Sequence, residues 1–163
     1  MTSKMIIREF PLTGNKRWID IQSPSAAELD QFAESHKIHQ QNLTDCLESD
    51  HLPKFEDTEP LQFLITRVIV GNTREDHTVQ EISSKVAMFF DENILITVHR
   101  LPHDFIEDMV KRYVEPKKIH QPKDIAVKLI KGSLRSFERF TLTLNEQIDH
   151  IEDTIFIKTR KIN

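Results

Sequence analysis

The feature that most constrains this chain is its last quarter, where residues 123 to 160 contain no proline and only one glycine, Gly132. A continuous helix of that length would be a rod of roughly 57 Å. Apolar residues recur there with alternating spacings of four and three, which is typical of a heptad seam. The seam consists of Ile130, Leu134, Phe137, Leu144, Ile148, Ile151 and Ile155, and Thr141 interrupts it. The preceding residues are too few to cover such a rod, so its outer half must pack on something else.

The composition indicates a folded domain and excludes several classes of protein. Hydrophobic residues make up 38% of the 163 residues and charged residues 29%, which is a normal globular balance. A net charge of -4 argues against nucleic acid as a partner. No run approaches 18 apolar residues, so we expect no segment of the chain to span a bilayer. The single cysteine, Cys46, cannot form an internal disulfide, which favours a reducing compartment.

Local patterns before the long helix predict an α/β (α+β) fold. Strands are expected over residues 5–10, 17–21, 61–70, 79–90 and 94–99, and the short connections after residue 61 favour an antiparallel meander. Helices are expected from Pro24, with Ser23 as its cap, to about His36, from 40 to 49, and from Pro102 to about 115. The segment between Pro53 and Pro60 reads as a loop. We therefore predict a mixed, largely antiparallel sheet flanked by helices in residues 1–121, followed by one long helix in 122–163.

Candidate metal ligands fall into histidine pairs and acidic clusters. His36 with His39, and His99 with His103, have spacings that a metal could use. The first pair lacks a cysteine or carboxylate partner at a typical spacing, and the second straddles a strand end and a proline. One acidic cluster consists of Asp45, Glu48, Asp50, Glu56, Asp57 and Glu59, and the other of Glu146, Asp149, Glu152 and Asp153. Carboxylates suit Mg²⁺, which often keeps most of its water. Taken alone, such clusters are more often solvated faces than metal sites.

Several motifs, in order, resemble the CorA magnesium transporter family. The short helix at residues 42–47 precedes Pro53-Lys54-Phe55-Glu56 and the strand Phe63-Leu64-Ile65. Trp18-Ile19-Asp20 resembles an early strand of the family, and residues 88–99 resemble its paired strands. Residues 144–152 resemble the Ile-Asp-x-Ile-Glu stretch on its first long cytoplasmic helix. The resemblance covers almost the whole chain.

The resemblance implies the cytoplasmic, metal-sensing part of a Mg²⁺ (Co²⁺) channel in the cell (inner) membrane. It also implies a homopentamer with regulatory Mg²⁺ sites between copies. Asp45 matches a metal ligand of the family, and Asp149 lies in a matching acidic stretch. The residue before Asp45 is often acidic in the family but is Thr44 here, so we expect weak Mg²⁺ binding by this chain. The family's stalk and transmembrane helices, with the Gly-Met-Asn signature, would follow Asn163, so this segment is not expected to transport ions itself.

Three alternatives stay open. The parent could be a zinc-transporting relative of the same superfamily, because the selectivity signature lies outside the chain. The chain could instead be a free-standing adaptor whose long helix docks partner coiled coils. An enzyme is the weakest alternative: three glycines leave no phosphate-binding loop, and no pairing of a nucleophile with a base stands out. In each case the exposed seam predicts that this chain self-associates through its long helix or frays beyond about Leu144.

Overall fold

The computed structural model describes residues 4–70 and 78–160 and contains one six-stranded mixed sheet. The strands are β1 (Ile6–Pro11), β2 (Arg17–Gln22), β3 (Lys54–Glu56), β4 (Gln62–Ile69), β5 (Ser83–Phe90) and β6 (Ile94–His99), in the order β1-β2-β6-β5-β4-β3. All neighbours are antiparallel except β2 and β6, which are parallel. The predicted meander is confirmed, and the fold class is the predicted α/β with a long C-terminal helix.

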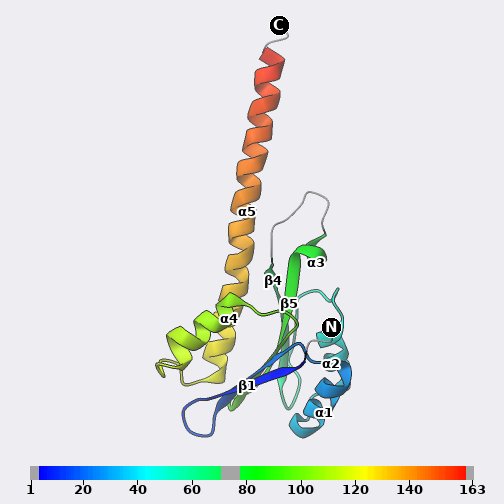
Figure 1. Cartoon of the computed structure of the whole chain (residues 1–163), viewed down its shortest axis with the longest axis vertical. Helices are drawn as coiled ribbons and strands as arrows, with labels where there is room; N and C mark the ends of the chain where they lie inside the picture. The colour runs from blue at the N-terminus through cyan, green and yellow to red at the C-terminus, as the bar shows by residue number, and fades with distance from the viewer. Residues whose placement is uncertain (1–3, 71–77, 161–163) are drawn as a thin grey trace.

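Helices cover both faces of this sheet (Figure 1). Helices α1 (Ala26–His36) and α2 (Gln40–Leu47) pack on one face. Helix α4 (Asp104–Met109), its π-helical continuation η1 (Val110–Val114) and the first part of α5 (Pro122–Arg160) pack on the other. Because side chains alternate along a strand, each central strand feeds both cores. On β2, for example, Trp18 points to the α5 side and Ile19 to the α1 side.

Helix α5 begins against the sheet and continues well beyond it (Figure 1). Ile125 and Leu129 are fully buried in its first part, and Gly132 lies under the ring of Phe105 from α4. A Cβ atom at position 132 would come within 2.9 Å of that ring, so the one glycine of the helix permits close packing of α4. The uninterrupted helix confirms the prediction from the proline-free stretch.

Two local predictions, one of a helix cap and one of a strand start, were wrong. Ser25, not Ser23, caps α1, because Ser25 and Glu28 form a reciprocal capping box. Residues 79–82, expected as the start of a strand, form the short helix α3 (Val79–Ile82). Thr78 and Glu81 form a second capping box there, and β5 starts only at Ser83.

Two further elements differ from the sequence prediction. The expected loop between Pro53 and Pro60 contains the three-residue edge strand β3, which pairs with β4 and is too short to show a periodic pattern. The helix expected from Pro102 to about residue 115 begins at Asp104 and changes to π-helical geometry at Val110. Within the described residues, no helix is both long and apolar enough to cross a membrane.

Candidate functional site

Asp45 lies on the last turn of α2, where two basic side chains of the same chain contact it. One carboxylate oxygen, Oδ2, accepts a hydrogen bond from the Lys54 ammonium, and the other lies 3.4 Å from His51 Nε2. The side chain of Asp45 is only 11% exposed. Lys54 also donates to Glu56 Oε1 at 2.8 Å. Burial alone would lower the pKa of Lys54, but its bonds to the two carboxylates more than offset this and raise it.

This arrangement has the right ligand chemistry for a hard cation but already holds a positive charge. The carboxylates of Asp45 and Glu56 converge on one ammonium, and oxygen ligands are those that Mg²⁺ prefers. A divalent ion at Asp45 would therefore displace Lys54 or share the carboxylate with it. Thr44 is exposed and its hydroxyl bonds back to its own helix, to the carbonyl of Gln40.

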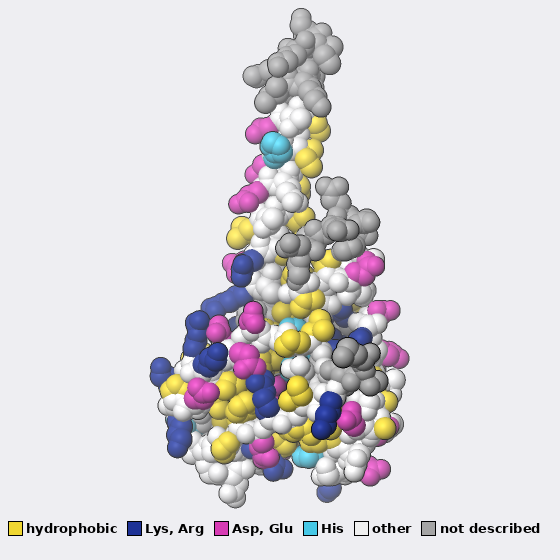
Figure 2. Space-filling view, in the orientation of Figure 1, with side chains coloured by type: hydrophobic (Ala, Val, Ile, Leu, Met, Phe, Trp, Pro, Cys, Tyr) yellow, Lys and Arg dark blue, Asp and Glu magenta, His cyan; other side chains and the backbone are white. Residues whose placement is uncertain are grey.

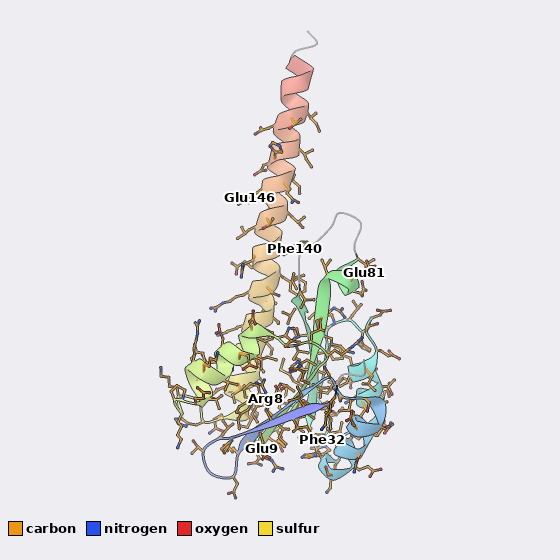
Figure 3. The ribbon with its side chains drawn as sticks, in the orientation of Figure 1. Arg8, Glu9, Phe32, Glu81, Phe140 and Glu146 are labelled. Carbon is orange, nitrogen blue, oxygen red and sulfur yellow. The ribbon has the colours of Figure 1, made fainter. Side chains whose placement is uncertain are left out.

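The structure does not bring Asp149 near Asp45 within one chain. Asp149 is exposed in the outer part of α5, one turn beyond Glu146, which lies far from α2 (Figures 1 and 3). Among the described residues, no group of three or more His, Cys, Asp or Glu side chains is arranged to hold a metal ion. A site that used both residues would need two copies of the chain.

Neither histidine pair points its ring nitrogens at a shared position. His36 stacks on Phe32 and bonds to its carbonyl, whereas His39 Nε2 bonds to the carbonyl of Glu59. The rings of His99 and His103 are 5.4 Å apart between centroids. Both nitrogens of His99 are already used by acceptors, so this pair does not form a metal site in the described structure.

A buried polar network on the α4 side of the sheet escaped the sequence analysis. Asp20 on β2, with a fully buried side chain, accepts hydrogen bonds from Thr97 Oγ1 (2.5 Å) and His99 Nε2 (3.0 Å) on β6. Arg8 on β1, labelled in Figure 3, closes the network with a 2.7 Å bond to the same carboxylate. Burial would raise the pKa of Asp20, but His99, Thr97 and Arg8 more than offset it and hold the pKa below its usual range.

His99 and its neighbour His103 differ in their hydrogen bonding. Nε2 of His99 faces the Asp20 carboxylate and Nδ1 lies 2.6 Å from the carbonyl oxygen of Leu101. Both partners are oxygen acceptors. The buried His103 has no hydrogen-bond partner for Nε2 in the described structure. Burial, with the adjacent charge of His99, lowers the pKa of His103 to about 4. The sequence signal that could have revealed this buried network was the alternation of polar residues on strands 17–22 and 94–99.

Two buried cations bind the end of α2 on the opposite face of the sheet. Lys85 on β5 donates to the carbonyls of Asp45 and Glu48. Arg67, its register partner on β4, donates from Nη1 to the carbonyls of Ser49 (2.9 Å) and His51 (3.0 Å). These bonds fix the segment that carries Asp45. Cys46 lies beside them, and burial raises the pKa of its thiol to about 12, so it is a small core residue.

This chain matches one known protein family over most of its length. Residues 14–163 match the family model described as CorA-like Mg²⁺ transporter protein. No curated protein sequence matches the chain. Among solved structures, the cytoplasmic domain of ZntB from Vibrio parahaemolyticus superposes with a TM-score of 0.70 at 15% identity, covering 90% of this chain and 64% of that one.

Two structures of CorA from Methanocaldococcus jannaschii are also similar. Its soluble domain gives a TM-score of 0.63 at 21% identity and covers 87% of this chain and 56% of that one. The complete transporter gives 0.64 at 18% identity and covers 94% of this chain and 51% of that one. The similarity extends along nearly all of this chain, which spans about half the length of these structures.

Proposed function

Because this chain belongs to the CorA-like Mg²⁺ transporter family, we propose that it is the cytoplasmic, metal-sensing part of a divalent-cation channel in the cell membrane. The family match from residue 14 to residue 163 is the observation that carries the proposal. The shape of α5 supports it: an extended helix with an apolar side suits assembly with further helices and with other copies in a pentamer. The transported ion would be Mg²⁺ or Co²⁺, and the pore would lie in a part of the parent protein beyond this chain.

Asp45 is the proposed regulatory ligand within this chain. It lies at the end of α2 and is held in place by the backbone bonds of Lys85 and Arg67. Lys54 competes with a metal ion for its carboxylate. We therefore expect weak Mg²⁺ binding by the isolated chain, with Asp149 and further carboxylates from neighbouring copies completing the site in the parent.

The test uses the full-length parent protein in proteoliposomes and measures Mg²⁺ uptake with an internal fluorescent indicator. Asp45→Ala should leave uptake intact and weaken its inhibition by internal Mg²⁺. Glu59→Gln, a neutralisation in the same acidic cluster at an exposed position, is the matched control and should behave as the wild type. A parent protein that carries no divalent cation would refute the proposal. Normal inhibition in Asp45→Ala would refute only the role of Asp45 and would leave the proposed transport function standing.

Calorimetry on the isolated chain tests the competition with Lys54. The wild-type chain should bind Mg²⁺ weakly, and Lys54→Met should bind it more tightly because the competing ammonium is gone. Adding Asp45→Ala to Lys54→Met should abolish that gain. Micromolar affinity in the wild type, unchanged by Asp45→Ala, would contradict the assignment.

The similarity to the cytoplasmic domain of ZntB favours a second candidate, the same regulatory role in a zinc transporter. The same proteoliposomes, loaded with a zinc indicator, distinguish the two candidates. Uptake of Zn²⁺ without uptake of Mg²⁺ would select the second.

A further inference from the structure

A cavity of about 670 Å³ lies at one end of the sheet, outside the carboxyl ends of β2 and β6. The amino end of β5, the end of β4 and the last residues of α2 complete its wall. Ser23, at the rim, adopts a left-handed backbone conformation with φ of 55°. It joins the two parallel strands, because its N–H donates to the carbonyl of His99 and its hydroxyl to that of Arg100. Asp45, the ligand proposed above, is not among the residues that line the cavity.

The position of the cavity in the topology is one that favours ligands. Strands β2 and β6 are parallel neighbours, and the chain leaves them in opposite directions. After β2 it turns to α1 on one face, and after β6 it turns to α4 on the other (Figure 1). Where two adjacent parallel strands lead to opposite faces, their connections separate and leave a crevice, which is the usual binding site of open α/β sheets.

The buried charges of the cavity are both positive. Arg67 is 3% exposed and Lys85 9% exposed, and they face each other across β4 and β5. In the described part of the chain, neither forms an ion pair with a carboxylate. The acidic side chains of the lining, Glu48 and Glu81, are exposed, so water screens them. The buried carboxylate of Asp45 lies close enough to attract Lys85, so the two cations are only partly compensated, and burying them carries a desolvation cost.

The two buried cations differ in the N–H donors that they leave for a ligand. All five N–H donors of Arg67 are used, by Ser83 and by the carbonyls of Ser49, His51 and Gln80. Arg67 therefore has no donor left for a ligand and acts on the cavity only through its charge. Lys85 donates to two carbonyls, and its ammonium carries three N–H groups, so one remains for a ligand.

We propose that this cavity binds a small phosphate-bearing molecule, with Lys85 as the direct ligand of the oxyanion and Arg67 as a second buried positive charge behind it. Arg100, exposed at the rim, adds a third cation. Val98, Leu101 and Pro102 provide an apolar wall for an organic portion. Phosphate suits the site because two neighbouring cations match a doubly charged anion.

The test measures binding of inorganic phosphate and of AMP, without metal ions, to the purified chain at constant ionic strength. Both should raise the thermal midpoint in a saturable way and shift backbone NMR signals of Ser23, Ser84 and Arg100. Lys85→Met should weaken binding at least about tenfold, the loss of one charge-assisted hydrogen bond. Lys111→Met, an exposed lysine outside the cavity, should bind as the wild type. Tighter binding of AMP than of phosphate would identify an organic phosphate as the ligand, and equal binding would identify the free anion.

Arg100→Ala keeps the test decisive if Lys85→Met does not fold, because Arg100 is exposed and its replacement leaves the core intact. It should weaken binding by about threefold to tenfold. Equal responses of Lys85→Met and Lys111→Met, signal shifts away from the ends of β2 and β6, or no response to either probe would each overturn the proposal.

Discussion

The two halves of α5 have similar apolar spacing but different surroundings. In the first half, Ile125 and Leu129 are completely buried against the sheet, whereas in the outer half Leu142 is 59% exposed and Ile148 52% exposed. Figure 2 shows hydrophobic side chains along one side of the outer helix and acidic side chains on the other. The heptad pattern therefore specifies a helix and its apolar side. The presence of a packing partner decides how much that side contributes to stability. Within this chain, stability should reside in the sheet and the first half of α5.

The largest effect should come from the buried network of the sheet. Asp20→Ala leaves His99 and Arg8 without their carboxylate, and removing one partner of a buried ion pair typically costs about 3–5 kcal/mol of unfolding free energy. Asp149→Ala, in the outer helix, should cost less than about 0.5 kcal/mol. Urea unfolding followed by the fluorescence of the single, buried Trp18 measures both. Similar losses for the two variants would contradict the division between sheet and outer helix.

A matched pair of leucines tests the same division within α5. Leu129→Ala removes a fully buried side chain and should cost about 2–5 kcal/mol. Leu142→Ala makes the same chemical change at an exposed position and should cost less than about 0.5 kcal/mol. The same urea titration compares them. A loss above about 1 kcal/mol for Leu142→Ala would show that the outer helix is already packed on a partner copy.

Acid should destabilise the sheet region through His103. Its folded-state pKa is lowered to about 4 from 6.5, so the unfolded chain takes up the proton first as the pH falls. The stabilisation is complete above pH 6.5 and is lost between 6.5 and 4, by up to about 3 kcal/mol. The charged or titratable groups around it are His99, Asp20 and Asp104. The buried ring contacts His99 and Phe105, so its protonation acts on the core and not on the outer helix.

Thermal unfolding at a series of pH values checks this effect. His103→Gln should flatten the dependence between pH 6.5 and 4, whereas His150→Gln, the same change in the outer half of α5, should not. Parallel curves for the wild type and His103→Gln would show that another group is responsible.

The sequence predicted the elements with strong periodic patterns and missed those decided by tertiary contacts. The strands at 62–69 and 94–99 are rich in β-branched residues, and α5 lacks any helix breaker, so local chemistry was sufficient. Short β3 exists only because β4 offers an edge, and α3 depends on a capping box at Thr78 that a strand pattern concealed. The position of Asp45 on α2 was predictable from the motif. The ion pair between Asp45 and Lys54 depends on the pairing of β3 with β4, which the sequence did not show.

The smallest effect on unfolding free energy should come from the outer seam, where the expected change is in assembly. Leu144 is 38% exposed and Ile148 52% exposed, and they lie on one side of α5 with Ile151 and Ile155. Each large apolar side chain moved fully out of water contributes roughly 1.5–3 kcal/mol, so even partial burial of the seam favours pairing. We expect the chain to self-associate in a concentration-dependent manner through this side, as an antiparallel or exchanged pair, with weaker contact at Thr141.

Leu144→Asp/Ile148→Asp should be monomeric in sedimentation equilibrium while its Trp18-detected unfolding stays within about 0.5 kcal/mol of the wild type. Thr143→Asp/Glu146→Asp, which leaves the apolar side intact, should associate as the wild type does. If the wild-type chain is instead monomeric, hydrogen exchange should show fraying beyond about Leu144, because an unpaired helix in water is marginal. A monomer with a fully protected helix through its last turns would contradict both outcomes and show that the outer half is stable without any partner.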